Sequence, residues 1–201
     1  MQFYKNLSDD LHCFQAAFLM ILSKYYPKKT YTYKDADKIT GFKKNAPTWD
    51  SKGLLWLAKK GFVITRISTF DYKRFAREGE KYLQWFWRPD VYEWQSKNAN
   101  FRREQELVQK LLPHARFLKR EATIKDIDNL FKKDATVIAS INPHILDKKK
   151  GYANHSVVIT NVTKTHIEFN DPGLPPHKER TVTKSQFQRA LHDVIGITKV
   201  K

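Results

Sequence analysis

Cysteine is nearly absent from this sequence, since Cys13 is the only one among 201 residues. A single cysteine excludes an internal disulfide and is typical of a reducing compartment. Long apolar runs are also absent, so the sequence predicts no membrane-spanning helix. The first residues lack a basic head followed by an apolar stretch, and we therefore expect no signal peptide and a cytoplasmic location.

Acidic residues are scarce relative to basic ones, because 21 Asp and Glu stand against 37 Lys and Arg, a net charge of +16. A basic protein can attract nucleic acid, an anionic membrane or an acidic partner. Here the cations are spread along the chain, and the densest runs, 102–103 and 148–150, are short. No nucleic-acid-binding motif accompanies them. We expect a solvated basic surface, with an anionic partner as the alternative.

Metal-binding motifs are missing too. His12 and Cys13 are adjacent, and with His155 they would make a set of zinc ligands. However, the sequence contains neither a Cys-x-x-Cys nor a His-Glu-x-x-His spacing. We expect no metal and no cofactor.

The chain is long enough to bury a sizeable core, because 41% of its residues are hydrophobic and 13% are aromatic. No repeat or linker divides it, which predicts one domain over residues 1–201. Helical periodicity dominates about residues 1–134, and strand-like patterns dominate about residues 135–201. This segregation predicts an α+β fold, in which an N-terminal helical part packs on a C-terminal antiparallel sheet.

Apolar periodicity and cap residues predict the individual elements. Helices are expected over 12–25 and 34–40, from a cap at Thr48 to Gly61, within the aromatic-rich segment 71–117, over 123–131 after a capping box formed by Thr123 and Asp126, and over 184–191. Strands are expected over 62–67, 135–141, 156–160, 165–169 and 194–200, and a polar loop over 42–45. We expect the aromatic segment to pack as a layer on the core; a substrate-facing wall is the alternative.

Cys13 falls in the first turn of the helix expected over 12–25, after the N-cap residue types Ser8, Asp9 and Asp10. Apolar residues recur along this helix at helical spacing, so it buries one face. The free N–H groups and the macrodipole of a helix N-terminus favour a thiolate over a thiol. On its own, however, a lone cysteine is more often a small buried hydrophobe.

Two expected strands flank a polar turn near Thr163. A hairpin symmetric about that residue pairs Ile159 with Ile167 on the buried face. Following this face to the open end of the hairpin places His155 opposite Asp171, with Cβ atoms roughly 4.5–5.5 Å apart. A histidine held by a carboxylate is the arrangement of base and orienting group that activates a nucleophile.

The one thiol supplies the missing nucleophile. Cys13 precedes His155 by 142 positions (155 − 13), within the roughly 130–150 spacing of papain-type enzymes. The order Cys, His, Asp also fits such enzymes. We therefore predict a Cys13–His155–Asp171 triad, with the alternative that Asp171 only caps the turn at 171–173.

Three stretches surround these residues: Asp10…Cys13-Phe14-Gln15-Ala16, Gly151-Tyr152-Ala153-Asn154-His155-Ser156-Val157-Val158 and Asn170-Asp171-Pro172-Gly173-Leu174-Pro175-Pro176. Together they resemble a known family, the bacteriocin-processing, double-glycine leader peptidase-like proteins of the papain-like superfamily. The resemblance covers about residues 4–197. It implies a papain-like fold with Cys13 as nucleophile, His155 as base and Asp171 as its orienting group.

The sequence departs from that family in two respects. Family peptidases usually carry a Gln about six residues before the nucleophile, which donates to the oxyanion hole. Leu7 stands in that place, and Asn6 is the candidate donor beside the Cys13 N–H. Losing one such donor typically slows the reaction by about 10²–10³, so weak activity or none is expected. Family members that process exported peptides are fused to a transporter, whereas this chain is expected to act alone or beside a partner.

Three further residues are expected in the substrate pocket. Trp49 lies at the start of a helix, Asn142 ends a strand next to the one that carries His155, and Asn154 directly precedes His155. Core packing is the alternative for Trp49, and a strand-terminating turn is the alternative for Asn142.

These patterns predict a cysteine peptidase-type hydrolase that cleaves peptide bonds through a thioester and has a peptide or protein as substrate. An acyl or amide transferase with the same triad is one alternative. A catalytically silent peptide-binding or regulatory domain is the other. A Cys13 of lowered pKa in an open cleft favours the two enzymes, and a Cys13 buried away from His155 favours the silent domain.

Overall fold

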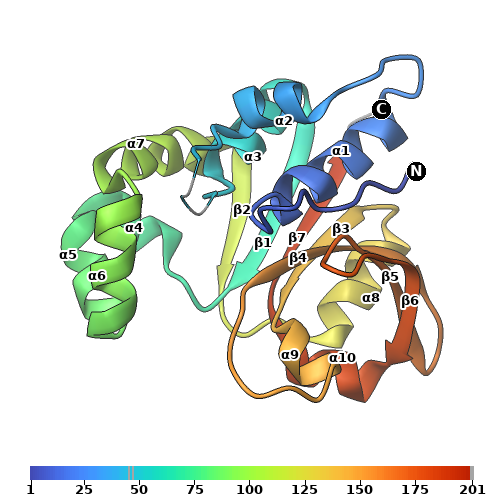
Figure 1. Cartoon of the computed structure of the whole chain (residues 1–201). Helices are drawn as coiled ribbons and strands as arrows, with labels where there is room; N and C mark the ends of the chain where they lie inside the picture. Colours follow the sequence, from blue (N-terminus) through green and yellow to red (C-terminus); the bar gives the residue numbers. More distant parts are fainter. Residues whose placement is uncertain (45, 47, 200–201) are drawn as a thin grey trace.

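A seven-stranded sheet, in the order β2-β1-β7-β3-β4-β5-β6, runs through the computed structural model, which describes residues 1–44, 46 and 48–199 (Figure 1). The strands are β1 (Phe62–Ser68), β2 (Ala115–Lys119), β3 (Thr136–Ile141), β4 (His155–Val162), β5 (His166–Asp171), β6 (His177–Thr183) and β7 (Leu191–Lys199). Neighbouring strands are antiparallel except β1 and β2, which pair in parallel.

Helices precede, interrupt and flank this sheet. They are α1 (Cys13–Tyr25), α2 (Tyr33–Thr40), α3 (Ser51–Lys59), α4 (Tyr72–Glu78), α5 (Glu80–Phe86), α6 (Pro89–Asn98), α7 (Phe101–Leu111), the 3-10 turn η1 (Leu112–His114), α8 (Ile124–Lys132), α9 (Pro143–Leu146) and α10 (Lys184–Ala190). Capping boxes begin α2, α8 and α10. Within the described ranges, none of the helices has the length and apolar character needed to cross a membrane.

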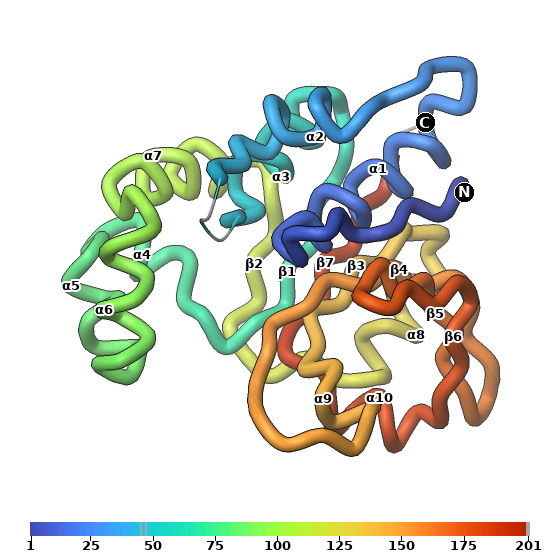
Figure 2. Tube along the Cα trace, in the orientation of Figure 1, coloured from blue at the N-terminus to red at the C-terminus, as the bar shows by residue number. Residues whose placement is uncertain are grey.

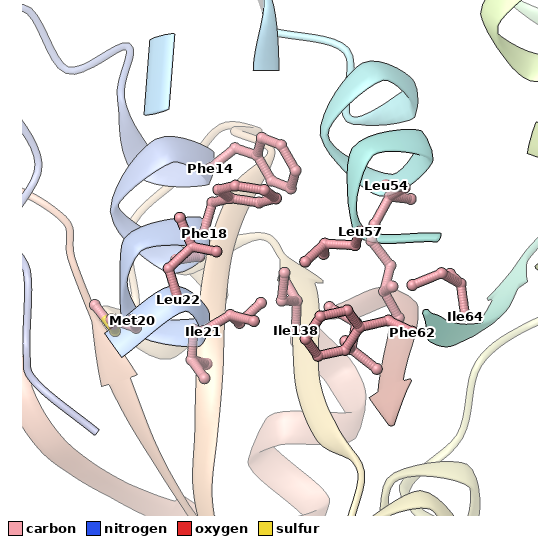
Figure 3. Packing of buried hydrophobic residues seen from close by; sticks show 14 of the residues in the cluster. Phe14, Phe18, Met20, Ile21, Leu22, Leu54, Leu57, Phe62, Ile64 and Ile138 are labelled. Atoms are coloured by element: carbon pink, nitrogen blue, oxygen red, sulfur yellow. The ribbon is translucent and has the colours of Figure 1, made fainter. Parts of the chain in front are cut away.

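Helices α1 and α3 cover one face of the sheet. Phe18 and Ile21 of α1 pack with Leu57 of α3 against Phe62 and Ile138 of the sheet (Figure 3). Residues 14–22 of α1 are all buried, because this helix lies between the sheet and other segments rather than on the surface. Figure 2 shows the blue N-terminal helix beside the orange and red C-terminal strands, so the two ends of the sequence meet at α1.

Helices α8 and α10 cover the other face. Ile127 of α8 and Phe187 of α10 pack with Val157 and Phe169 of the sheet. The rings of Phe169 and Phe187 are 5.2 Å apart in an edge-on arrangement, a favourable geometry for two aromatic side chains. With both faces covered, the central strands carry apolar residues on both sides, as in β3, where every residue is buried.

The aromatic-rich segment forms a layer of its own. Phe75, Tyr82, Leu83 and Phe101 are buried together, and Trp49 packs against this cluster. Figure 1 shows α4, α5 and α6 to one side of the sheet, joined to it through α7. The aromatic side chains do pack together as expected, but in a cluster separate from those on the two faces of the sheet, and α6 buries no residue.

Several element predictions need correction. The segment 71–117 ends not in a helix but in β2, and the strand β6 was not predicted at all. The helix expected to be capped by Thr48 begins at Ser51, because the Thr48 hydroxyl instead accepts a hydrogen bond from Gln15 Nε2 at 2.9 Å. In the loop predicted at 42–45 and the strand predicted at 194–200, Asn45 and Val200 lie outside the described residues.

The register of the β4–β5 hairpin also differs from the prediction. Ile159 pairs with Phe169, not with Ile167, because the turn is not symmetric about Thr163 and Val162 pairs with Ile167. A β-bulge between residues 159 and 161 then changes the register again by one residue. The net offset from the predicted pairing is two residues.

Candidate functional site

Cys13 is the first residue of α1, and its side chain is half-buried. His12, at the N-cap, makes no side-chain cap hydrogen bond, and the first N–H groups of a helix have no partner within the helix. Backbone N–H groups of Phe14 and Ser156 help to lower the pKa of the Cys13 thiol, against the effect of burial. The starts of α1 and β4 therefore both favour the ionised form of the thiol.

His155 and Asp171 meet where β4 begins and β5 ends. His155 Nε2 lies 2.7 Å from Asp171 Oδ1, and both side chains are buried. The predicted contact is present, although the two residues are not directly opposite. A two-residue offset keeps the alternation of side chains along a strand, so both still project from the same face.

The thiol and the imidazole shift each other's protonation. Burial raises the pKa of the Cys13 thiol, but the hydrogen bond and charge interaction with His155 lower it below its ordinary value. Burial lowers the pKa of His155, but Asp171 and Cys13 together raise it to about 10. Because Nε2 faces Asp171, Nδ1 is the nitrogen available to Cys13. This arrangement favours a thiolate–imidazolium pair.

Asp171 is held by three donors. Desolvation raises the pKa of this carboxyl group, but hydrogen bonds from His155, the Gly173 N–H and Arg180 lower it below its usual range. Gly173 N lies 2.9 Å from Oδ1, and Arg180 Nη1 lies 3.0 Å from Oδ2. A Cβ at position 173 would lie 2.9 Å from Asp171 Oδ1, so this close backbone approach requires glycine.

A cavity of about 230 Å³, here called the thiol cavity, opens beside these groups. It is walled mainly by the loop between β3 and β4 on one side and by the turn after β5 on the other. The lining residues are Asp10, Cys13, Pro143, His144, Asp147, Lys149, Ala153, Asn154, His155, Asp171, Gly173, Leu174, Pro175, His177 and Arg180. The thiol and the carboxylate-bound imidazole thus share one polar cavity.

Asn6, the expected oxyanion donor, is buried outside the lining of the thiol cavity. Its side-chain nitrogen donates to Asp10 Oδ1 at 2.8 Å, and its side-chain oxygen accepts from the His12 N–H at 2.8 Å. Its own N–H donates to the Pro172 carbonyl at 2.7 Å. Asn6 therefore links the segment before Cys13 to the turn that follows Asp171.

A second and larger cavity, of about 890 Å³, adjoins the first and is here called the aromatic cavity. Trp49, Phe70 and Trp87 belong to its walls, and Asn154 lines both cavities. Trp49 also packs on Phe75, with ring centroids 5.6 Å apart, so it combines core packing with a place in the cavity wall.

Asn142 is buried and lines neither cavity. Its side chain accepts from the N–H groups of His144 and Ala153 at 3.2 and 3.3 Å and donates to the Gly151 carbonyl at 3.2 Å. Asn142 therefore shapes the loop that walls the thiol cavity.

Other charged residues near the thiol were not expected from the sequence. Arg180 and Asp147 line the thiol cavity, but Arg180 lies on the unpredicted strand β6. Asp10 was noted as a cap residue and in one of the stretches that resemble the family, but not as a site residue; it lines the cavity in a left-handed backbone conformation with φ 57°. His12, in contrast, faces Asp9 and Asp37 through its two ring nitrogens.

Neither a family model nor a curated protein matches the sequence. The structure is similar to the peptidase domain of Streptococcus ComA, a bi-functional ABC transporter involved in a quorum-sensing pathway. The TM-score is 0.53 with 12% sequence identity, and the match covers 98% of this chain and 97% of the other. At this identity the likeness concerns the fold, and it confirms the predicted papain-like α+β class.

Proposed function

We propose that this chain is a cysteine peptidase-type hydrolase that cleaves peptide bonds through a thioester on Cys13. The observation that carries the proposal is that the chain's single thiol shares a cavity with a buried imidazole held at 2.7 Å by a carboxylate. The likeness in fold to a peptidase domain supports the same class of reaction.

In this proposal, the Cys13 thiolate attacks the carbonyl carbon of the scissile peptide bond, and the carbonyl oxygen becomes an oxyanion. The tetrahedral intermediate collapses as protonated His155 gives its proton to the leaving amine, which departs and leaves a thioester. A water molecule, deprotonated by His155, then attacks the thioester and releases the acid and Cys13. Asp171 orients the imidazole and stabilises its charged form.

The Cys13 N–H, in the first turn of α1, is the proposed donor to the oxyanion. Asn6 can add a second donor only if its side-chain nitrogen leaves Asp10, to which it is hydrogen-bonded at 2.8 Å. Absence of one oxyanion donor typically lowers the rate by about 10²–10³. We therefore expect slow turnover.

We propose that the substrate peptide extends from the thiol cavity into the aromatic cavity. Asn154 lines both, so a chain bound along it would pass from one to the other. The walls of the aromatic cavity, including Trp49 and Trp87, fit a large apolar side chain of the substrate.

A catalytically silent peptide-binding domain is a second candidate function. The hydrogen bond between Asn6 and Asp10 favours it, because that bond leaves the proposed second oxyanion donor occupied. The two candidates differ in whether bound peptide is cleaved.

The test is turnover of a peptide library, followed by mass spectrometry of the products. We expect cleavage by the wild type and a loss of at least about a thousandfold in Cys13→Ala, as is found when a triad nucleophile is removed. A mass increase equal to the acyl part of the peptide, seen on the wild type at short times or on Cys13→Ser, would identify the acyl-enzyme. Binding of peptides without cleavage by the wild type would favour the silent domain. Equal cleavage by Cys13→Ala would contradict the assignment of the nucleophile.

A further inference from the structure

Arg180 is a charged residue that the three-residue mechanism does not use. It lies on β6, where it is the only charged residue that is not exposed, and its guanidinium group contacts two carboxylates. Nη1 lies 3.0 Å from Asp171 Oδ2, and Nη2 lies 2.7 Å from Asp147 Oδ1. One planar cation thus joins the carboxylate behind His155 to a residue of the β3–β4 loop.

The contact with Asp171 leaves each carboxylate oxygen with its own partners. Oδ1 accepts from His155 and from the Gly173 N–H, and Oδ2 accepts from Arg180. Asp171 is only 3% exposed, so an unpaired Oδ2 would be a buried polar atom without compensation. Arg180 therefore fixes the carboxylate in the orientation that points Oδ1 at the imidazole.

The contact with Asp147 reaches the wall of the thiol cavity. Asp147 follows α9 in the loop that supplies Pro143, His144, Lys149 and Asn154 to the lining of that cavity. A substrate bound in the cavity would touch this loop, and Arg180 would transmit its position to Asp171.

We propose that Arg180 is a positioning residue that fixes Asp171 against His155 and ties this pair to the substrate-facing β3–β4 loop. The proposal rests on the proposed peptidase function and deepens it. The positive charge has a second consequence. A cation beside Asp171 offsets part of the carboxylate charge and opposes protonation of His155, so it helps the imidazolium to release its proton to the leaving group.

Other titratable and charged groups face the same cavity and contribute to its pH dependence. They are Cys13 from α1, Asp10 from the segment before it, His144, Asp147 and Lys149 from the β3–β4 loop, and His177 from β6. Lys149 Nζ lies 3.8 Å from Asp147 Oδ2, so the loop carboxylate already has a second cation when Arg180 is changed.

The experiment compares Arg180→Gln, Arg180→Lys and Asp147→Asn with the wild type in peptide turnover across pH and in NMR titration of the His155 ring. In Arg180→Gln we expect kcat to fall about 10- to 100-fold, because the base is less well oriented. We also expect the His155 titration and the alkaline limb of activity to move to higher pH.

Arg180→Lys retains the charge but cannot bridge two carboxylates in the same planar way, so the alkaline limb should stay while KM rises. Asp147→Asn should raise KM more than it lowers kcat.

A matched control is Arg120→Lys, because Arg120 makes a two-pronged contact with Asp126, at 2.7 and 2.6 Å, away from the thiol cavity. We expect that variant to leave the His155 titration in place. Circular dichroism verifies folding of each variant. A His155 titration that stays in place in folded Arg180→Gln would overturn the proposal. A shift to lower pH would show that Asp171 has moved away from His155, which supports the positioning role and contradicts the charge effect. The NMR titration needs no turnover, so it tests Arg180 even if the chain cleaves no peptide.

Discussion

Cys13 is the chain's single cysteine, so every measurement of thiol reactivity in this protein reports on one position. The N-terminal position in α1 was readable from the sequence because helical periodicity is local, although the N-cap is His12 and none of the cap types at positions 8–10. The second influence on the thiol, the imidazole of His155, comes from a residue 142 positions away (155 − 13). The protonation state of the Cys13 sulfur therefore depends on both the N-terminus of α1 and the imidazole of His155.

Replacing His155 by Ala should raise the pKa of Cys13, because the hydrogen bond and charge interaction that lower it are lost. Each unit of pKa changes the thiolate fraction tenfold below the pKa, so alkylation by iodoacetamide at pH 6 should fall by about tenfold or more. His166→Ala, at an exposed histidine, should leave the rate unchanged. Equal alkylation rates in wild type and His155→Ala across pH 5–8 would contradict the pairing.

Asn6 and Gly173 make hydrogen bonds that were not predicted from the sequence. Asn6 was predicted as a donor from its distance along the chain to Cys13, but its side chain is used by Asp10 and His12. Gly173 was noted in a turn and in one of the stretches that resemble the family, without a role of its own; its lack of a side chain is what allows its N–H to reach Asp171. Sequence spacing cannot predict which of several nearby groups a polar side chain binds.

Local rules predicted most helices and the central strands, and they failed for the two edge strands. β6 is mostly exposed, so it lacks the apolar alternation that identifies a strand, and β2 directly follows a helix and a 3-10 turn. Both strands are paired because a neighbour offers free backbone groups, which is a tertiary effect. Because β6 was not predicted, Arg180 was not expected to lie beside Asp171.

The β-bulge in β4 decides which face of the hairpin His155 occupies relative to Asp171. Near the turn, Val162 pairs with Ile167, and continuing that register would pair residue 159 with residue 170. Side chains alternate with a period of two, so a one-residue change would put His155 and Asp171 on opposite faces. The bulge restores the parity on which their contact depends.

The capping box at the start of α8 permits a prediction for that helix. Asp126 accepts from the Thr123 N–H at 2.9 Å and binds Arg120, so Asp126→Ala should lower the free energy of unfolding by about 1–2 kcal/mol at pH 7. The hydrogen bond from Arg120, together with those from Thr123, lowers the pKa of Asp126 despite the effect of burial. Its contribution is therefore present above its ordinary pKa of 3.8 and is lost as the pH falls through the lowered value.

Urea unfolding of Asp126→Ala and wild type at pH 7 and at pH 3 measures this difference. Asp128→Ala is a control on the same helix that does not remove the cap. A loss of stability in Asp126→Ala that is as large at acid pH as at pH 7 would contradict the electrostatic part of the argument.

At the scale of the whole molecule, the sheet takes strands from both halves of the sequence. β1 and β2 come from the part predicted to be mainly helical, and β7 inserts between β1 and β3. This arrangement supports the prediction of one domain over residues 1–201, which stays a prediction. Arg66 of β1 adds a link, because its guanidinium group binds Asp50 before α3 and Asp193 of β7.

Arg66→Met should lower the free energy of unfolding by about 1–3 kcal/mol, because it leaves two half-buried carboxylates without their cation. Arg66 is 6% exposed, and with Asp50 and Asp193 it lines the aromatic cavity. The triple variant Arg66→Met, Asp50→Asn, Asp193→Asn should recover part of the loss, and Arg77→Met, at an exposed arginine, should change stability little.

A single urea transition seen by both tryptophan fluorescence and circular dichroism is expected for one domain. Two separate transitions, or a loss under about 1 kcal/mol in Arg66→Met, would contradict these expectations.

The sequence by itself determined the α+β class, the placement of the thiol at a helix start and the presence of histidine and aspartate on one hairpin. These follow from periodicity and caps, which act over a few residues. Only the tertiary structure decided the hairpin register, the contact between α1 and β4, the position of Arg180 and the two adjoining cavities. Those depend on bulges, edge pairing and packing between distant segments, whose energies do not appear in any local stretch of the chain.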